Sequence, residues 1–138
     1  MMCRAICGVA LAIAAVLPVH AAGLSLVGLG GATVGSAKIN LAKGSVTIKT
    51  TGLGTLPASV DPGTGAFDAY LYKAYLTSTT DPAVEIFVGD VWPNTKGKAA
   101  VKAKLKGNLE GLGFDQVLIV AFSKDATQSA DVATAALQ

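Results

Sequence analysis

Hydrophobic and polar residues alternate in short stretches along most of this chain, and glycine or proline separates the stretches. Residues 98–106 show the cleanest alternation, with apolar side chains at the odd positions from Ala99 to Leu105 and lysines at most of the even ones. A period of two is that of a β-strand with one buried face. The same alternation over residues 36–49, interrupted at Gly44, predicts a hairpin. No stretch has a convincing helical period.

The most continuous apolar run outside the N-terminus covers residues 114–122, and its length and β-branched content predict a central strand. Its two faces are both apolar: Val117, Ile119 and Ala121 on one, Leu118, Val120 and Phe122 on the other. Both faces therefore need cover. The second face is covered either by another part of this chain, the Gly-rich start or the Ala-rich end, or by a partner or second copy.

Further elements are predicted between these strands and at the end of the sequence. Residues 66–76 form an aromatic strand of ambiguous register, in which Tyr70, Tyr72 and Leu76 share one face and Phe67, Leu71 and Tyr75 share the other. Residues 84–89 form the next strand. Residues 51–65, rich in Gly and Pro, form a long surface connection. Residues 126–138 are either a final edge strand or a short helical tail.

Strands at intervals of roughly ten residues, separated by Gly and Pro turns, are typical of an antiparallel sandwich or barrel. We therefore expect an all-β, immunoglobulin-like or Greek-key sandwich of about seven to eight strands. Residues 36–138 form a single domain, and residues 23–35 are a Gly-rich N-terminal arm or edge strand.

The N-terminus predicts the compartment. Arg4 supplies a positive charge, an apolar run follows from Ile6 to Leu17, and Pro18 precedes small residues suited to cleavage. This is the pattern of a secretory signal peptide over residues 1–22, and the apolar run is shorter than the roughly 20 residues of a membrane-spanning helix. We expect a secreted or periplasmic protein with no membrane span after cleavage.

Removal of residues 1–22 also removes both cysteines, the one histidine and the one arginine. Without histidine, a Ser-His-Asp triad is excluded, and a carboxylate-pair hydrolase remains as a distant alternative. The remaining ten Lys against nine Asp plus Glu give no overall field for steering onto nucleic acid. We therefore predict a protein that is not an enzyme, with no catalytic, cofactor or metal site and no nucleic-acid partner.

Two features are candidates for partner binding. Lys98, Lys102, Lys104 and Lys106 lie on one face of a predicted strand, about 7 Å apart at successive same-face positions. Their two interpretations are contact with an anionic surface or protein, and protection of an edge strand from pairing with another chain. Trp92, in a turn beside Pro93, is the aromatic residue most expected to be exposed, whereas most of the other rings are expected in the core.

The successive strands also resemble a family of small exported domains. The segments that carry this resemblance are Gly35-Ser-Ala-Lys-Ile, Gly44-Ser-Val-Thr-Ile, Asp68-Ala-Tyr-Leu-Tyr, Val88-Gly-Asp-Val, Gly97-Lys-Ala-Ala and Asp115-Gln-Val-Leu-Ile-Val. They are similar to strands of immunoglobulin-like domains such as the extracytoplasmic domain of anti-sigma-K factors and the small domain that accompanies DOMON modules.

Two alternatives for the function remain. The first, which follows from the missing catalytic residue types and the candidate surface features, is a secreted, non-enzymatic binding or assembly module that acts at a surface. The second, which the resemblance implies, is an accessory redox or metal-binding domain of the DOMON-associated type, whose last strand often carries a cysteine. The corresponding strand here, from Val117 to Phe122, has none. The anti-sigma role depends on a membrane-spanning regulator, and the sequence after residue 22 predicts no such span.

Overall fold

The computed structural model describes residues 23–137, so the signal peptide predicted for residues 1–22 lies outside the described part of the chain. The described residues form nine β-strands and no helix. The strands are β1 (Gly23–Gly28), β2 (Thr33–Asn40), β3 (Ser45–Thr50), β4 (Ala58–Val60), β5 (Phe67–Thr77), β6 (Glu85–Val91), β7 (Ala99–Lys104), β8 (Gln116–Ser123) and β9 (Ser129–Ala136). The all-β prediction is confirmed.

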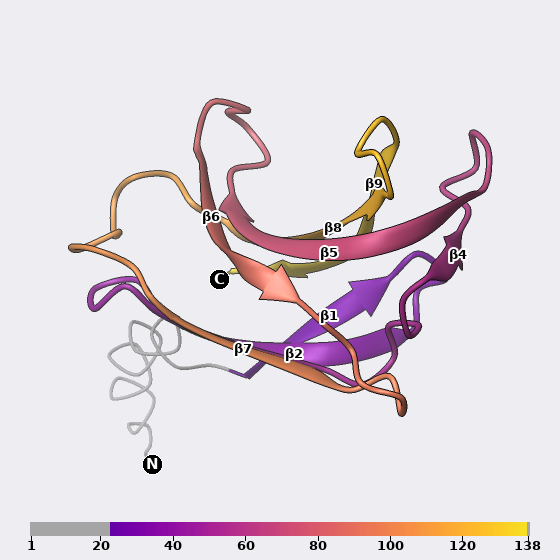
Figure 1. Ribbon diagram of the computed structural model, residues 1–138. Helices are drawn as coiled ribbons and strands as arrows, with labels where there is room; N and C mark the ends of the chain where they lie inside the picture. Colours follow the sequence, from indigo (N-terminus) through magenta and orange to yellow (C-terminus); the bar gives the residue numbers. More distant parts are fainter. Residues whose placement is uncertain (1–22, 138) are drawn as a thin grey trace, which may run out of the picture.

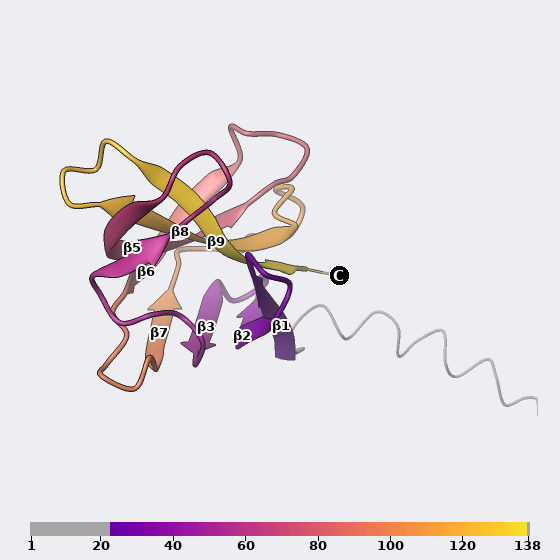
Figure 2. The same cartoon turned by 90° about the vertical axis from the view of Figure 1, so that its right-hand side faces the viewer.

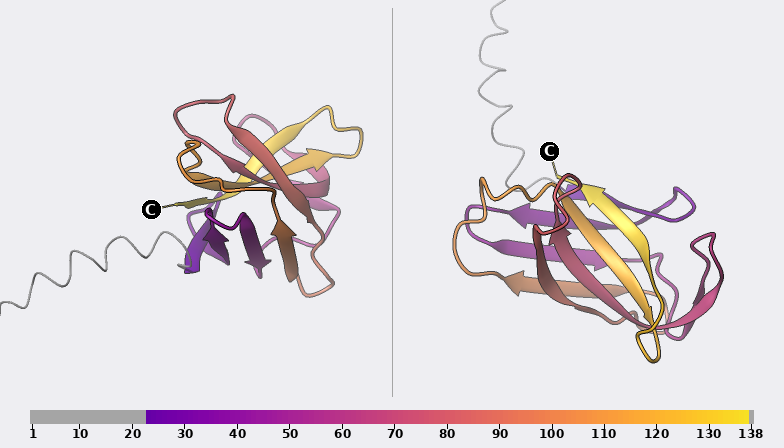
Figure 3. Two further views of the ribbon diagram at one scale, coloured as in Figure 1. Left: turned by 90° about the vertical axis from the view of Figure 1, so that its left-hand side faces the viewer. Right: turned by 90° about the horizontal axis from the view of Figure 1, so that it is seen from above.

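All nine strands belong to one antiparallel sheet in the order β4-β5-β8-β9-β1-β2-β3-β7, with β6 also paired to β5. The sheet is curled, so that β5, β6, β8 and β9 lie over β2, β3 and β7 (Figures 1 and 2). We call β4, β5, β6, β8 and β9 the β5 half, and β1, β2, β3 and β7 the β2 half. Strands of the two halves cross at an angle when seen from above (Figure 3).

The core fills the space between the halves because every strand turns one alternating set of apolar residues inward. In the predicted hairpin, which is confirmed as β2 and β3, Ile39 lies opposite Val46 and Ala37 opposite Ile48, and all four are buried. Gly44 has a φ of +71° in the turn between these strands. Strand β8 supplies Val117, Ile119 and Ala121, each 0% exposed, and pairs with β5 and β9 on its two sides.

The first and last described segments both form internal strands of the sheet. Residues 23–35, considered above as an arm or an edge strand, form β1 and the start of β2, and β1 lies between β9 and β2. The Ala-rich end forms β9, which pairs with β8 along its length and meets β1 through Val27↔Thr134 and Gly28↔Ala133. It is therefore a strand, but an internal one and not an edge strand.

The surface connection expected over residues 51–65 contains the three-residue strand β4, which pairs with the start of β5. Beyond β4, the other part of the same edge of β5 pairs with β6. These short elements and the two chain ends raise the count to nine strands, where about seven to eight were expected. No helix within the described residues is long and apolar enough to span a membrane.

Candidate binding surfaces

The outward side of the β5 half carries a group of apolar and aromatic side chains that we call the aromatic face. It comes from three adjacent strands, because Tyr75 lies opposite Phe87 on β6 and Leu118 on β8, while Lys73 lies opposite Val120. The aromatic face consists of the aromatic and aliphatic residues and the one lysine that alternate with the core residues of these strands: Leu71, Lys73, Tyr75, Phe87, Leu118, Val120 and Phe122. None of these seven side chains is fully buried.

Ring contacts hold the centre of the aromatic face together. Tyr75 and Phe87 meet edge to face, with their ring centroids 5.7 Å apart. The Nζ atom of Lys73 lies 5.7 Å from the Phe87 centroid and 5.5 Å from the Phe122 centroid, so the ammonium contacts two rings. Cation–π and edge-to-face contacts of this kind orient side chains that would otherwise be mobile at a surface.

Carboxylates surround the aromatic face. Asp90 lies opposite Lys73 on β6, Asp131 lies opposite Val120 on β9, and both are exposed. Burial raises the pKa of the Tyr75 hydroxyl, and the negative charges of Glu85 and Asp90 raise it further. The phenol therefore stays neutral at physiological pH and can donate a hydrogen bond. An apolar centre with a polar rim is the usual anatomy of a protein interface.

Neither part of the chain that was expected to cover the second face of β8 does so. The Gly-rich start and the Ala-rich end both lie within the sheet as β1 and β9, and within residues 23–137 no strand lies over the aromatic face (Figure 1). The expectation that the aromatic residues belong to the core is right for Tyr72, which is 2% exposed, and wrong for Phe87, which is 48% exposed.

The predicted lysine row lies at the other side of the molecule. Lys102 and Lys104 are exposed on the outward side of β7, as is Ala100. Val101, on the opposite side of the strand, is buried. Lys98 and Lys106 are exposed beyond the two ends of that strand. Strand β7 is the last in the sheet order. Its lysines could therefore serve to keep this edge strand from pairing with another chain. Trp92, in the turn after β6, is 59% exposed, as predicted.

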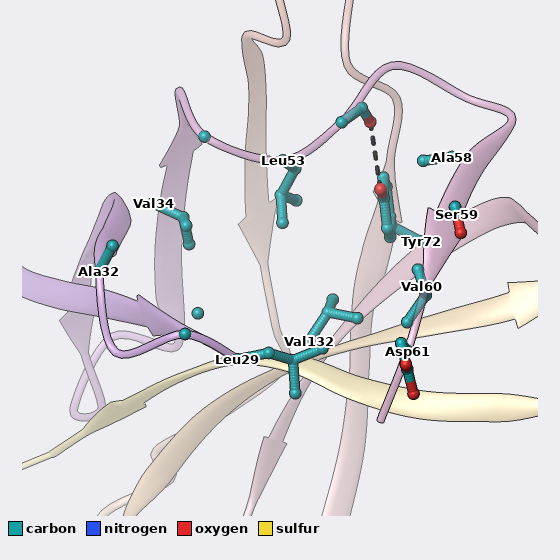
Figure 4. A pocket seen from close by; sticks show the side chains of 14 residues that line it. Leu29, Ala32, Val34, Leu53, Ala58, Ser59, Val60, Asp61, Tyr72 and Val132 are labelled. Carbon is teal, nitrogen blue, oxygen red and sulfur yellow. Dashed lines mark hydrogen bonds between the residues drawn. The ribbon is translucent and has the colours of Figure 1, made fainter. Parts of the chain in front are cut away.

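A small hollow opens between the two halves near the β1–β2 turn (Figure 4). Its volume is about 280 Å³, and the side chains of Val34, Leu53, Tyr72 and Val132 face it from four separate segments. Tyr72 donates a hydrogen bond to the carbonyl oxygen of Gly54 at 3.1 Å. The volume lies just below the range of roughly 300–1,000 Å³ in which small-molecule pockets fall, so the sheet faces are the stronger candidates.

Tyr72 makes the stability of this region depend on pH. Burial raises its pKa above the ordinary 10.0. The unfolded chain therefore loses this proton at a lower pH than the folded protein. The resulting stabilisation is fully present below about pH 10 and is lost as the pH rises through the raised pKa of the folded state.

For Tyr72→Phe, we expect a weaker loss of stability as the pH rises above about 10 than in the original protein. At neutral pH the variant should be about 1 kcal/mol less stable, because the bond to Gly54 is lost. Urea unfolding at a series of pH values measures both effects. An unchanged alkaline profile would contradict the role assigned to this hydroxyl.

The described residues contain no group of three or more His, Cys, Asp and Glu side chains that could hold a metal ion. Sequence comparison adds no relative: no protein-family model and no curated protein matches this chain.

Proposed function

We propose that this protein is an exported, non-enzymatic binding or assembly module that uses the aromatic face to hold a protein partner or a second copy of itself. The observation that carries the proposal is the exposure of Phe87 beside Tyr75, Lys73 and Phe122 on a face that no described strand covers. Exposed aromatic clusters with a polar rim are typical of interaction sites in soluble proteins.

The arrangement of the aromatic face favours binding energetically. Its rings are already oriented by contacts with one another and with Lys73, so little side-chain freedom remains to be lost on association. Aromatic side chains at the centre of an interface also dominate its binding energy. The N-terminal sequence pattern supports a secreted or periplasmic location for this activity.

Light scattering coupled to size-exclusion chromatography tests the proposal over a range of protein concentrations. If the aromatic face binds a second copy, the molar mass rises with concentration, and Phe87→Ser weakens the association roughly tenfold because a half-exposed ring is no longer buried. If the mass stays monomeric, a partner is sought by affinity capture from the outer compartment of the producing cell, with Phe87→Ser as the matched bait.

Trp92→Ser is the comparison variant, because Trp92 is the more exposed residue but lies outside the aromatic face. Retained association in this variant, together with loss in Phe87→Ser, supports the proposal. A monomer that captures the same proteins with and without Phe87 would contradict it.

The immunoglobulin-like, Greek-key interpretation of the fold is likewise a proposal. Its support is the curled sheet, in which the β5 half and the β2 half lie over each other with the core between them. A sandwich of this kind commonly presents one sheet face to a partner while the other face forms the core.

A further inference from the structure

Positive and negative side chains are separated in this molecule. Residues 23–60 and 91–109 contain eight of the ten lysines and no Asp or Glu. All nine acidic residues lie in residues 61–90 and 110–131. Because the first two segments include all of β1, β2, β3 and β7, the β2 half is strongly positive although the whole chain is nearly neutral. A charge pattern of this kind attracts an anionic partner to one side of a protein.

The lysines of the β2 half converge on its outward surface. Lys38 on β2, Lys49 on β3 and Lys102 on β7 border one hollow of about 460 Å³, together with the hydroxyl residues Ser36 and Thr47. The strand register explains this arrangement, since Thr47 lies between Lys38 and Lys102, and Ser36 lies opposite Lys49. We call these five residues the lysine face.

A second hollow of about 330 Å³ adjoins the first, because Lys49 borders both. Lys98 and Asn94 also border it, as does Thr50, whose buried hydroxyl has no hydrogen-bond partner among the described residues. The positive surface therefore continues from Lys38 past Lys49 to Lys98, which suits an extended chain with repeated negative charges better than a single small ion.

Protection of an edge strand does not account for this surface. That explanation applies to Lys102 on the outermost strand β7, but Lys38 and Lys49 lie on β2 and β3, which have neighbours on both sides. A solvated face would also be expected to mix charges of both signs. The absence of any acid from β1, β2, β3 and β7 is therefore unexplained by solubility alone.

We propose that the lysine face binds an acidic polysaccharide, a chain that carries carboxylate or sulfate groups on its sugars. Lysines on adjacent strands are about 5 Å apart per strand and about 7 Å apart along a strand, so several anionic groups of one chain can be contacted together. The interleaved hydroxyls of Ser36 and Thr47 and the amide of Asn94 can hydrogen-bond to those groups or to sugar hydroxyls.

The side chains around the two hollows argue against other anionic partners. No aromatic ring borders either hollow, so the stacking on which single-stranded nucleic acid binding depends is missing from the lysine face. No large aliphatic side chain borders them either, so nothing there would insert into the apolar part of a bilayer. The proposal concerns a different surface from the aromatic face and does not depend on it.

Heparin-affinity chromatography of the purified protein, with elution by a salt gradient, tests this proposal. We expect the original protein to be retained, and Lys38→Gln/Lys49→Gln to bind roughly tenfold more weakly and elute at lower salt. Lys49→Gln is compared with Lys124→Gln, which removes the same charge from the β5 half, and with Lys49→Arg, which keeps the charge in place. Circular dichroism and thermal unfolding establish that each variant is folded.

Several outcomes would overturn the proposal. An equal loss of retention in Lys49→Gln and Lys124→Gln would mean that heparin senses only net charge. Stronger binding to phosphatidylglycerol vesicles or to single-stranded DNA, lost in the double variant, would assign the lysine face to a membrane or a nucleic acid. A molar mass that rises at low salt only when Lys49 is present would assign it to the acidic half of a second copy.

The Phe87→Ser variant tests the lysine face independently of the function proposed for the aromatic face. That variant should bind heparin like the original protein, because Phe87 lies on the opposite half of the sheet. Alginate, which carries carboxylates, and neutral dextran then distinguish acidic sugars from sugars in general. Binding to dextran as strong as binding to heparin would contradict a role for the lysines.

Discussion

Replacing Ile119 with alanine should lower the free energy of unfolding by about 3 kcal/mol. Ile119 is fully buried in the middle of β8, and the residues opposite it on the neighbouring strands are Ala74 and Ala133. These small neighbours have no side chain that can move into the space left by the isoleucine, so most of the cavity would remain. The melting temperature should fall by on the order of 10 °C, measured by circular dichroism.

Val120→Ala is the matched control, because Val120 is the next residue of the same strand but points outward to the aromatic face. We expect this variant to lose no more than about 1 kcal/mol, since the removed methyl groups are partly in water already. Similar losses in the two variants would mean that both sides of β8 are equally buried, in conflict with an uncovered aromatic face.

Gly44→Ala should be the most damaging change in a turn, with an expected loss of about 2–4 kcal/mol. Gly44 has a φ of +71°, which is unfavourable for a residue with a Cβ atom. That Cβ would also overlap the carbonyl oxygen of Leu105 and lie 3.0 Å from that of Gly107. The turn would have to move away and weaken the 2.7 Å bond from the Leu105 N–H to the Gly44 carbonyl oxygen.

Alanine substitutions at two other glycines distinguish the cost of backbone strain from the cost of steric overlap of the new Cβ atom. Gly63 has a φ of +97° but open space around its Cα, so Gly63→Ala should cost only about 1 kcal/mol through backbone strain. Gly30 has neither a positive φ nor a close neighbour, so Gly30→Ala should leave stability nearly unchanged. Urea unfolding of the three variants measures the series. A Gly44→Ala protein as stable as Gly63→Ala would contradict the contact with residues 105–107.

The strands that the sequence predicts correctly are those in which the alternation of apolar and polar residues is uninterrupted. Strand β7 is an example, because its lysines are exposed while Val101 is buried. In β5 the same logic predicted that Tyr70 and Tyr72 share a face, which is wrong: Tyr70 is 40% exposed and Tyr72 is 2% exposed. The pairing with β8 shifts between Ala69 and Leu71, and such an irregularity displaces the alternation by one residue.

The two candidate binding surfaces could be predicted only in part. The row on β7 is visible in the sequence because its lysines are close along the chain. The β2–β3 hairpin brings Lys38 and Lys49 together, but these two lysines join Lys102 only through the pairing of β3 with β7. That pairing joins residues about fifty or more positions apart, such as Thr47 and Lys102, and leaves no local signal. Likewise, apolar side chains on both faces of β8 indicate that cover is needed, but not whether the cover comes from the same chain.

The order of the strands determines how the chain must fold. The first strand, β1, pairs with the last one, β9, while β3 pairs with β7 and β5 with β8. Hairpins such as β2–β3 and β8–β9 can form locally, but the pairings that close the core join segments far apart in the sequence. Such topologies fold in roughly milliseconds to seconds, because long loops must close before any contact stabilises them. The sheet is thus completed only when residues 129–136 have emerged during synthesis or transport, more than a hundred residues after β1.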